Sequence, residues 1–190
     1  MSFFFDLRRP RFQTEIRDQQ NRTIVLRDAL LRDAAALLAF NRQVDRETLF
    51  LTREPGEMNL SVEEERAWID SLLKQDNALI LLALHGERIV GMLDFVGGTW
   101  ARIRHAGEFG ISVLEEYWGS GIGSALLDEL IEWARKGGVI RKIRLRVVAT
   151  NERAIALYHR KGFVAEGYHP GELCVNGEDL PLVSMGLRLE

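Results

Sequence analysis

The fold is decided by residues 117–127, which read YWGSGIGSALL. Glycine occupies every second position from 119 to 123, and an amphipathic helix is expected to begin directly behind it. Glycine lets the backbone approach a ligand closely and adopt conformations that other residues avoid. The N-terminus of a helix presents unpaired N–H groups and the positive end of the helix dipole. The combination predicts an anion-binding site, and the expected anion is a phosphate.

Two familiar phosphate-binding loops do not match this stretch. A dinucleotide-binding loop requires G-x-G-x-x-G directly after a strand, with an acidic residue about 20 positions later. Here the glycines follow the pattern G-x-G-x-G, the preceding loop is longer, and the next expected strand carries arginines. A Walker loop requires Lys after its last glycine, whereas Ser124 follows Gly123. The loop therefore indicates a different class of phosphate site.

The composition is that of an ordinary globular domain. The chain has 190 residues, of which 46% are hydrophobic and 28% charged, and its formal net charge is −3. This length allows a sizeable core. The negative net charge argues against a nucleic-acid partner, and no apolar run is long enough to span a membrane. We therefore expect a cytoplasmic protein with neither nucleic-acid nor membrane partners.

Cysteine and histidine indicate neither a disulfide nor a metal site. Cys174 is the only cysteine, which excludes an internal disulfide and a multi-cysteine zinc site. The four histidines show no spacing typical of metal ligands. No bound metal is expected.

Strands and helices are expected to alternate along one domain. Residues 1–21 are polar and basic without periodicity and are interpreted as an N-terminal extension, with a single domain over residues 22–190. Strands are expected at residues 23–26, 78–84, 88–95, 107–113, 143–147, 163–167 and 180–187. Helices are expected at about 28–40, 61–74, 121–136 and 151–161. A loop of mixed polarity is expected at 42–60 and a polar loop at 171–179.

The glycine stretch resembles the acyl-CoA loop of the GNAT superfamily of N-acetyltransferases, whose motif is [QR]-x-x-G-x-[GA]. Gly121 and Gly123 stand at the glycine positions of the motif, and Trp118 replaces the usual Gln or Arg at its start. The resemblance continues through IVLRDA at residues 24–29, EFGISV at 108–113 and TNERA followed by LYHRKGF between residues 150 and 163. It covers most of the chain.

The resemblance implies a mixed α/β fold. A central, mostly antiparallel sheet of six to seven strands is expected, with helices on both faces. The strands at 108–113 and 143–148 are expected to splay apart, and acetyl-CoA, the expected cosubstrate, would enter between them.

The resemblance also assigns residues to cofactor binding. The glycine loop would bind the CoA pyrophosphate through backbone N–H groups, and the backbone of residues 111–113 would pair with the pantetheine arm. Asn151 is a natural helix N-cap, and the family also uses this side chain to contact pantetheine. The expected cofactor-binding residues are Ile111, Ser112, Val113, Trp118, Gly119, Ser120, Gly121, Ile122, Gly123, Ser124 and Asn151.

Two residues are candidates for acid–base catalysis. Glu108 could accept a proton from the attacking amine, although an edge-strand glutamate facing solvent is an equally ordinary explanation. The resemblance places the hydroxyl of Tyr158 beside the CoA sulfur, where it would protonate the leaving thiolate. A phenol suits this role, because it normally titrates near pH 10 and keeps its proton at neutral pH. Tyrosine at helical spacing from Ala154 is also typical of a core residue.

The predicted function is therefore N-acetyl transfer from acetyl-CoA to a primary amine by direct attack. The acceptor would be a protein N-terminus or a small-molecule amine, and Glu47, Glu54, Glu57 and Glu64 favour a cationic one. The pattern is nearest to ribosomal-protein and small-amine acetyltransferases. The alternative is a non-catalytic acyl-CoA-binding module, which would need neither Glu108 nor Tyr158. A homodimer is also expected from the resemblance.

Overall fold

All strands of the described chain, residues 10–189 of a computed structural model, join one eight-stranded sheet. In chain order they are β1 (Gln13–Arg17), β2 (Thr23–Asp28), β3 (Ala78–His85), β4 (Arg88–Gly97), β5 (Ala106–Val113), β6 (Lys142–Val148), β7 (Val164–Val175) and β8 (Glu178–Arg188). Their order across the sheet is β1-β2-β3-β4-β5-β6-β8-β7. Only the β5–β6 pair is parallel within the described residues. The predicted mixed, mostly antiparallel fold is confirmed.

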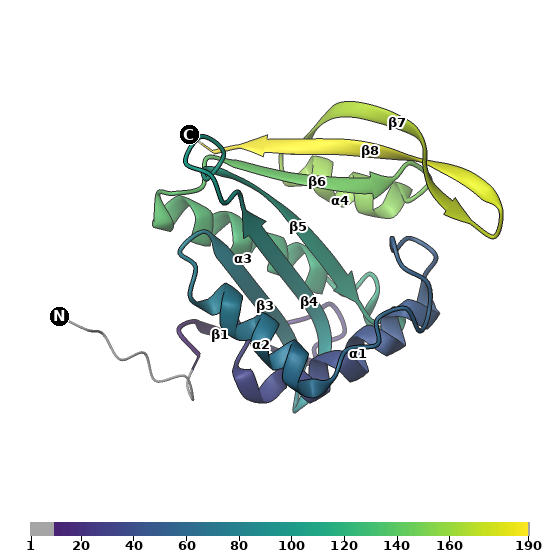
Figure 1. Ribbon diagram of the computed structural model, residues 1–190. Helices are drawn as coiled ribbons and strands as arrows, with labels where there is room; N and C mark the ends of the chain where they lie inside the picture. The colour runs from purple at the N-terminus through teal and green to yellow at the C-terminus, as the bar shows by residue number, and fades with distance from the viewer. Residues whose placement is uncertain (1–9, 190) are drawn as a thin grey trace.

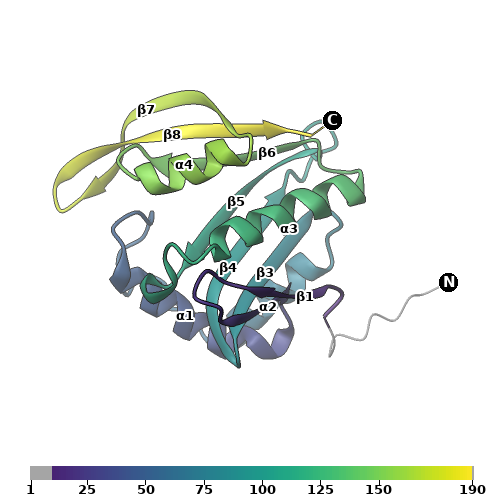
Figure 2. The ribbon, with the colours of Figure 1, turned by 180° about the vertical axis from the view of Figure 1, so that it is seen from behind.

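Helices cover both faces of the sheet, as predicted. Figure 1 shows α1 (Ala34–Glu47) and α2 (Val62–Leu73) in front of the strands, and Figure 2 shows α3 (Ile122–Gly137) and α4 (Glu152–Arg160) on the opposite face. Short 3-10 turns, η1 (Leu31–Asp33) and η2 (Glu115–Tyr117), precede α1 and the glycine loop. None of the helices in residues 10–189 is both long and apolar enough to cross a bilayer.

The sheet splits between β5 and β6. The two strands pair only at Ala106–Lys142, Gly107–Ile143 and Glu108–Arg144, and beyond this point they diverge (Figure 1). Each strand stays paired on its outer side, β5 to β4 as far as Val113 and β6 to β8 as far as Val148. The predicted splay of the central strands is therefore present.

The sheet contains one strand more than the seven expected. Residues 13–17, which lie within the expected N-terminal extension, form β1 and pair with β2 along their whole length. Only alternate side chains of this edge strand are partly buried, so its sequence carries little apolar signal. The first nine residues of the expected extension lie outside the described chain.

Two further boundaries differ from the sequence prediction. The expected polar loop at 171–179 is instead a hairpin, because β7 runs to Val175 and turns through Asn176 and Gly177, both at positive φ. Helix α1 begins at Ala34 rather than residue 28, because Asp28 stays in β2 while Asp33 binds the N–H of Leu30 in the preceding 3-10 turn.

The core lies against the centre of the sheet, where β3 and β4 are buried on both faces. Leu81, Leu82 and Leu93 are at most 2% exposed. The stripe predicted for the glycine-loop helix is confirmed, since its members are all buried in α3: Ile122, Leu126, Leu130, Ile131 and Ala134. β4 belongs to this buried centre, and together with its neighbour β5 it forms one wall of the site described below.

Replacing Leu93 by Ala should lower the free energy of unfolding by about 2–5 kcal/mol, because it leaves a cavity at a fully buried position. Chemical denaturation followed by circular dichroism measures this change. Val96→Ala is the matched control on the same strand, since Val96 is exposed and should cost far less. Equal losses for both variants would contradict the placement of the core.

Candidate active site

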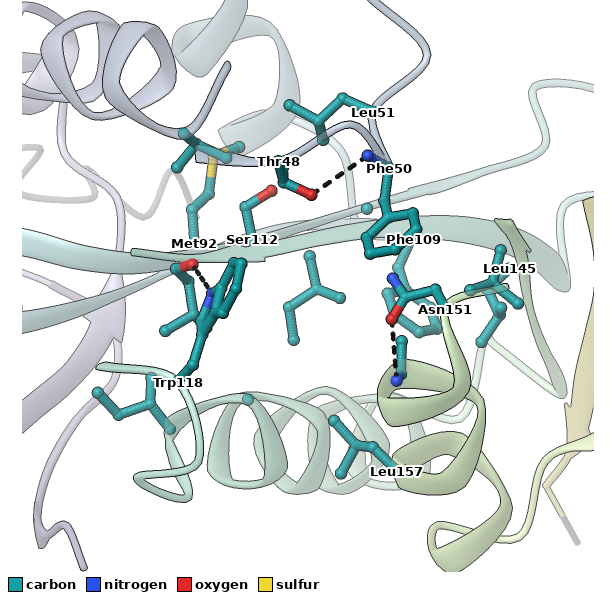
Figure 3. Close-up of a pocket in the computed structure, with 18 of the residues that line it drawn as sticks. Thr48, Phe50, Leu51, Met92, Phe109, Ser112, Trp118, Leu145, Asn151 and Leu157 are labelled. Atoms are coloured by element: carbon teal, nitrogen blue, oxygen red, sulfur yellow. Dashed lines mark hydrogen bonds between the residues drawn. The ribbon is translucent and has the colours of Figure 1, made fainter. Parts of the chain in front are cut away.

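A large cavity opens where β5 and β6 separate. Its volume is about 1200 Å³, and its walls come from β4, β5, β6, α2, α3, α4 and the loop after α1. In Figure 3, Phe50 and Leu51 approach from that loop, whereas Asn151 and Leu157 face them from α4. The cavity brings together every residue predicted for the site: Glu108, Ile111, Ser112, Val113, Trp118, Gly119, Ser120, Gly121, Ile122, Gly123, Ser124, Asn151 and Tyr158.

The glycine loop adopts a backbone that favours glycine. Gly119 and Gly121 have φ angles of 73° and 94°, in the left-handed region. No atom lies within 4 Å of where a Cβ of Gly119 would be, so its conformation rather than a lack of space calls for glycine. Within the described residues, the N–H groups of residues 121–124 donate to no backbone carbonyl. These free donors at the positive end of α3 fit a phosphate.

Neighbouring segments hold the glycine loop in place. The N–H of Gln19, in the turn between β1 and β2, donates to the carbonyl of Ser120 at 3.0 Å. The buried hydroxyl of Ser120 donates to the carbonyl of Tyr117, whose own hydroxyl lies 2.8 Å from Nδ1 of His85. The backbone N–H of Ser120 also donates to the carbonyl of Tyr117, at 3.3 Å. The hydroxyl, the N–H and the carbonyl of Ser120 are therefore all used inside the protein.

One edge of β5 is unpaired beside the cavity. Residues 111–113 pair with residues 91–93 of β4, but none of them pairs with β6. An extended amide-containing chain can hydrogen-bond to such an edge in the manner of an added strand. The geometry therefore fits the backbone contacts predicted for the pantetheine arm.

The structure explains what tryptophan does at the first position of the motif. The indole N–H of Trp118 donates to the carbonyl of Val113 at 2.7 Å, which ties the start of the glycine loop to the end of β5 (Figure 3). The guanidinium carbon of Arg153 lies 4.0 Å from the centre of the Trp118 ring, in cation–π contact.

Arg153 also lines the cavity, and within the described chain it forms no ion pair. Its charge thus stands beside the glycine loop, where the motif of the family would place Gln or Arg. No sequence pattern indicates this arrangement, because Arg153 and Trp118 are far apart along the chain.

Glu108 is at the exact end of β5–β6 pairing, on the cavity wall. Its carboxylate accepts from Nε of Arg146 at 3.2 Å, and both side chains are about half exposed. An exposed ion pair of this kind is weak. Glu108 can therefore exchange Arg146 for a substrate, but its own surroundings are largely aqueous.

Tyr158 is held in an aromatic cluster with Phe109 and Phe163, which it meets edge-to-face. Burial raises its pKa to about 12. The phenol thus keeps its proton at every physiological pH.

Asn151 caps α4, because its side-chain oxygen accepts from the N–H of Ala154. This bond uses the oxygen and leaves the amide N–H₂ group at the cavity.

The cavity also holds charged groups that sequence reasoning missed. Asp94 lines it from β4, and burial raises the pKa of this carboxyl to about 6. Its cross-strand neighbour is Gly110, where a Cβ would come within 3.1 Å of a carboxylate oxygen of Asp94. The absence of a side chain at Gly110 therefore gives Asp94 its space.

Glu65 lines the cavity from α2 and is 2% exposed. Burial raises its pKa, while the charge of Arg53 opposes that effect. The four glutamates that the sequence suggested for the acceptor side do not line the cavity: Glu47, Glu54, Glu57 and Glu64. Glu64 instead completes the predicted capping box with Ser61 at the start of α2.

The sequence contains a pattern from which Asp94 and Glu65 could have been identified. Asp94 interrupts the otherwise apolar run of β4, and Glu65 stands four residues before Ile69 on the buried face of α2. A charged residue at an apolar position is the feature to look for.

Comparisons with known proteins agree with this geometry. A family model described as the acetyltransferase (GNAT) family matches residues 42–163. A GNAT-family acetyltransferase from Streptococcus pneumoniae has a TM-score of 0.85 at 32% sequence identity, over 88% of this chain and 99% of that one. The L-methionine sulfoximine/L-methionine sulfone acetyltransferase of Pseudomonas aeruginosa is 27% identical, over 87% of this chain and 94% of its own length. The putative acetyltransferase yncA from Salmonella typhimurium, solved with its cofactor acetyl-CoA, shares the fold with a TM-score of 0.78 at 22% identity, over 88% and 94% of the two chains.

The fold and the split site thus define an acyltransferase. The chain belongs to the acetyltransferase (GNAT) family, and it is an acetyl-CoA-dependent enzyme of that family. The predicted family membership is confirmed, and the enzyme is favoured over a non-catalytic binding module.

Replacing Arg153 by Ala should weaken acetyl-CoA binding about tenfold, because a charge-assisted contact to phosphate is lost. Calorimetric titration measures the dissociation constant. Acetyl-pantetheine, which lacks the CoA phosphates, should bind the variant and the original protein equally. Arg135→Ala is the control, since Arg135 is exposed on α3 and does not line the cavity. Equal weakening for both thioesters would show that Arg153 does not contact phosphate.

Proposed function

We propose that this enzyme transfers the acetyl group of acetyl-CoA to the primary amine of a small molecule. One observation carries the proposal: a single cavity joins the free N–H groups of the glycine loop to a buried carboxyl, Asp94, whose pKa lies near neutral pH. Acetyl-CoA supplies the activated acyl group. The Pseudomonas relative, an acetyltransferase of small amino-acid analogues, supports a small acceptor.

The glycine loop and the free edge of β5 position the thioester. N–H groups of residues 121–124 bind phosphate, and the backbone of residues 111–113 holds the pantetheine arm and the thioester carbonyl. Donors directed at that carbonyl stabilise the negative charge that develops on its oxygen.

Asp94 serves as the proton acceptor. The acceptor ammonium first releases a proton to water, and its nitrogen then attacks the acetyl carbon; a C–N bond forms and the C–S bond breaks. The nitrogen becomes strongly acidic as the new bond forms, and a carboxylate with a pKa of about 6 can then take its proton at pH 7. That proton ends on the CoA sulfur, so amide and thiol are the products.

Tyr158 stabilises the leaving sulfur by hydrogen bonding. Its pKa of about 12 lies well above the usual value for a thiol, so complete transfer of its proton to a thiolate would be uphill. A hydrogen bond from the phenol still lowers the energy of the thiolate as the C–S bond breaks. This assigns Tyr158 a narrower task than protonation of the leaving group.

Replacing Asp94 by Asn should lower kcat/KM about 10²–10⁴-fold, because the proton acceptor is lost. In the original enzyme the rate should fall as the pH drops through about 6, where Asp94 becomes protonated. The variant should lack that step. Thiol release measured from pH 5 to 8 gives both results, and a variant that kept the step would exclude Asp94 as the group responsible.

Glu108→Gln tests the other candidate. Because Glu108 is half exposed and paired with Arg146, the change should reduce kcat less than Asp94→Asn does. The same pH series measures it. A loss larger than that of Asp94→Asn would move the role of proton acceptor to Glu108, and full kcat at every pH would remove Glu108 from catalysis.

A further inference from the structure

One carboxylate oxygen of Glu65 is buried without a partner at the wall of the cavity. Oε1 of this residue has no hydrogen bond and is shielded from solvent. Leaving a buried carboxylate unpaired is costly, and native proteins rarely tolerate it without a reason. Glu65 lies in the wall of the cavity, where the ammonium group of a ligand would offset the charge of the buried carboxylate.

Arg53 does not neutralise Glu65. Its Nε donates to Oδ1 of Asp45 at 2.8 Å, and its Nη2 forms an ion pair with the same oxygen at 2.7 Å. Asp45 is itself buried. At longer range, the charge of Arg53 partly offsets the rise in pKa that burial causes in Glu65 and Asp94. Arg53 is therefore occupied by Asp45 and is a poor site for an anionic group of the substrate.

The acceptor half of the cavity, which α2, β4 and the loop after α1 line, is negatively charged and otherwise apolar. Its ionisable groups are Glu65, Asp94 and Arg53, and the charge of Arg53 is offset by its ion pair with the buried Asp45 behind the lining. Apolar side chains surround them: Phe50, Leu51, Met58, Leu60, Trp68 and Met92. Such a space favours a cation with a hydrocarbon body and disfavours a carboxylate-bearing molecule such as an amino acid.

We infer that the acceptor is a short diamine-like molecule whose second ammonium binds Glu65 while its first is acetylated beside Asp94. This inference rests on the proposed acetylation of a primary amine. The second ammonium pairs with the carboxylate of Glu65, and the hydrocarbon chain between the two nitrogens contacts the apolar lining. Glu65 is then a specificity-determining residue rather than part of the chemistry.

Three four-carbon amines test the inference. Putrescine carries a second ammonium at its far end, butylamine ends in a methyl group, and γ-aminobutyrate ends in a carboxylate. Calorimetric titration into CoA-saturated protein should give putrescine a dissociation constant about 10–100-fold lower than that of butylamine. γ-Aminobutyrate should bind more weakly than either. Tighter binding of γ-aminobutyrate or of an α-amino acid would overturn the inference.

Glu65→Gln should bring putrescine and butylamine to within about threefold of each other, because the carboxylate that distinguishes them is gone. Glu63→Gln is the matched control, since Glu63 is exposed on the same helix turn and outside the cavity. It should preserve the preference for putrescine. A preference that survived Glu65→Gln would assign it to another group.

Thermal unfolding separates binding from a structural role. Glu65→Gln removes an unpaired buried charge, so its Tm should stay equal or rise. A lower Tm, with all three amines weakened alike, would mean that Glu65 supports the fold and would overturn the inference. Thiol release with the same amines tests the proposed function separately: a preference for putrescine in binding without any turnover would contradict acetylation and leave the Glu65 site standing.

Discussion

The rest of the structure depends on the point where two parallel strands stop pairing. β5 and β6 share only the pairs that end at Glu108 and Arg144, and each is then held on its outer side alone, by β4 and by β8. The backbone groups along the inner edge of β5 beyond Glu108 therefore have no strand partner within residues 10–189. An extended chain that carries amides can hydrogen-bond to such an edge. The split is thus a place where the fold offers pairing to a bound chain.

The two ends of the resulting cavity differ in their chemistry. The glycine loop offers N–H donors, a helix terminus and Arg153, all of which favour negative charge. The loop after α1 and the α2 helix offer carboxyls within an apolar lining. Asp94 stands on β4, the strand that borders β5, and so joins the two ends. A donor rich in phosphate and an acceptor carrying positive charge would each find complementary surroundings.

Most of the fold could be predicted from local patterns. The glycine spacing and the apolar stripe behind it located α3, and the Ser61–Glu64 capping box located α2, because both signals are confined to a few neighbouring residues. β1 was missed because in this edge strand only alternate side chains are even partly buried. The hairpin at 171–179 was missed because its residues are mostly polar on both faces.

The site residues that could be predicted are those that the glycine loop and the family resemblance indicate. Every residue named from them lines the cavity, although their roles stay predictions. Asp94, Glu65 and Arg153 could not be assigned in advance, because their importance comes from contacts between distant segments. Arg153 matters through Trp118, and Glu65 through the burial that α2 imposes on it.

The hydrogen bond from Gln19 to Ser120 couples the first hairpin to the glycine loop. β1 is a five-residue edge strand, and only two of its side chains are partly buried. Anything that fixes the glycine loop also fixes the carbonyl to which Gln19 donates, and by thermodynamic reciprocity an ordered hairpin favours a loop ready for phosphate. The opening residues of the domain thereby share in the energetics of a site formed more than a hundred positions further along the chain.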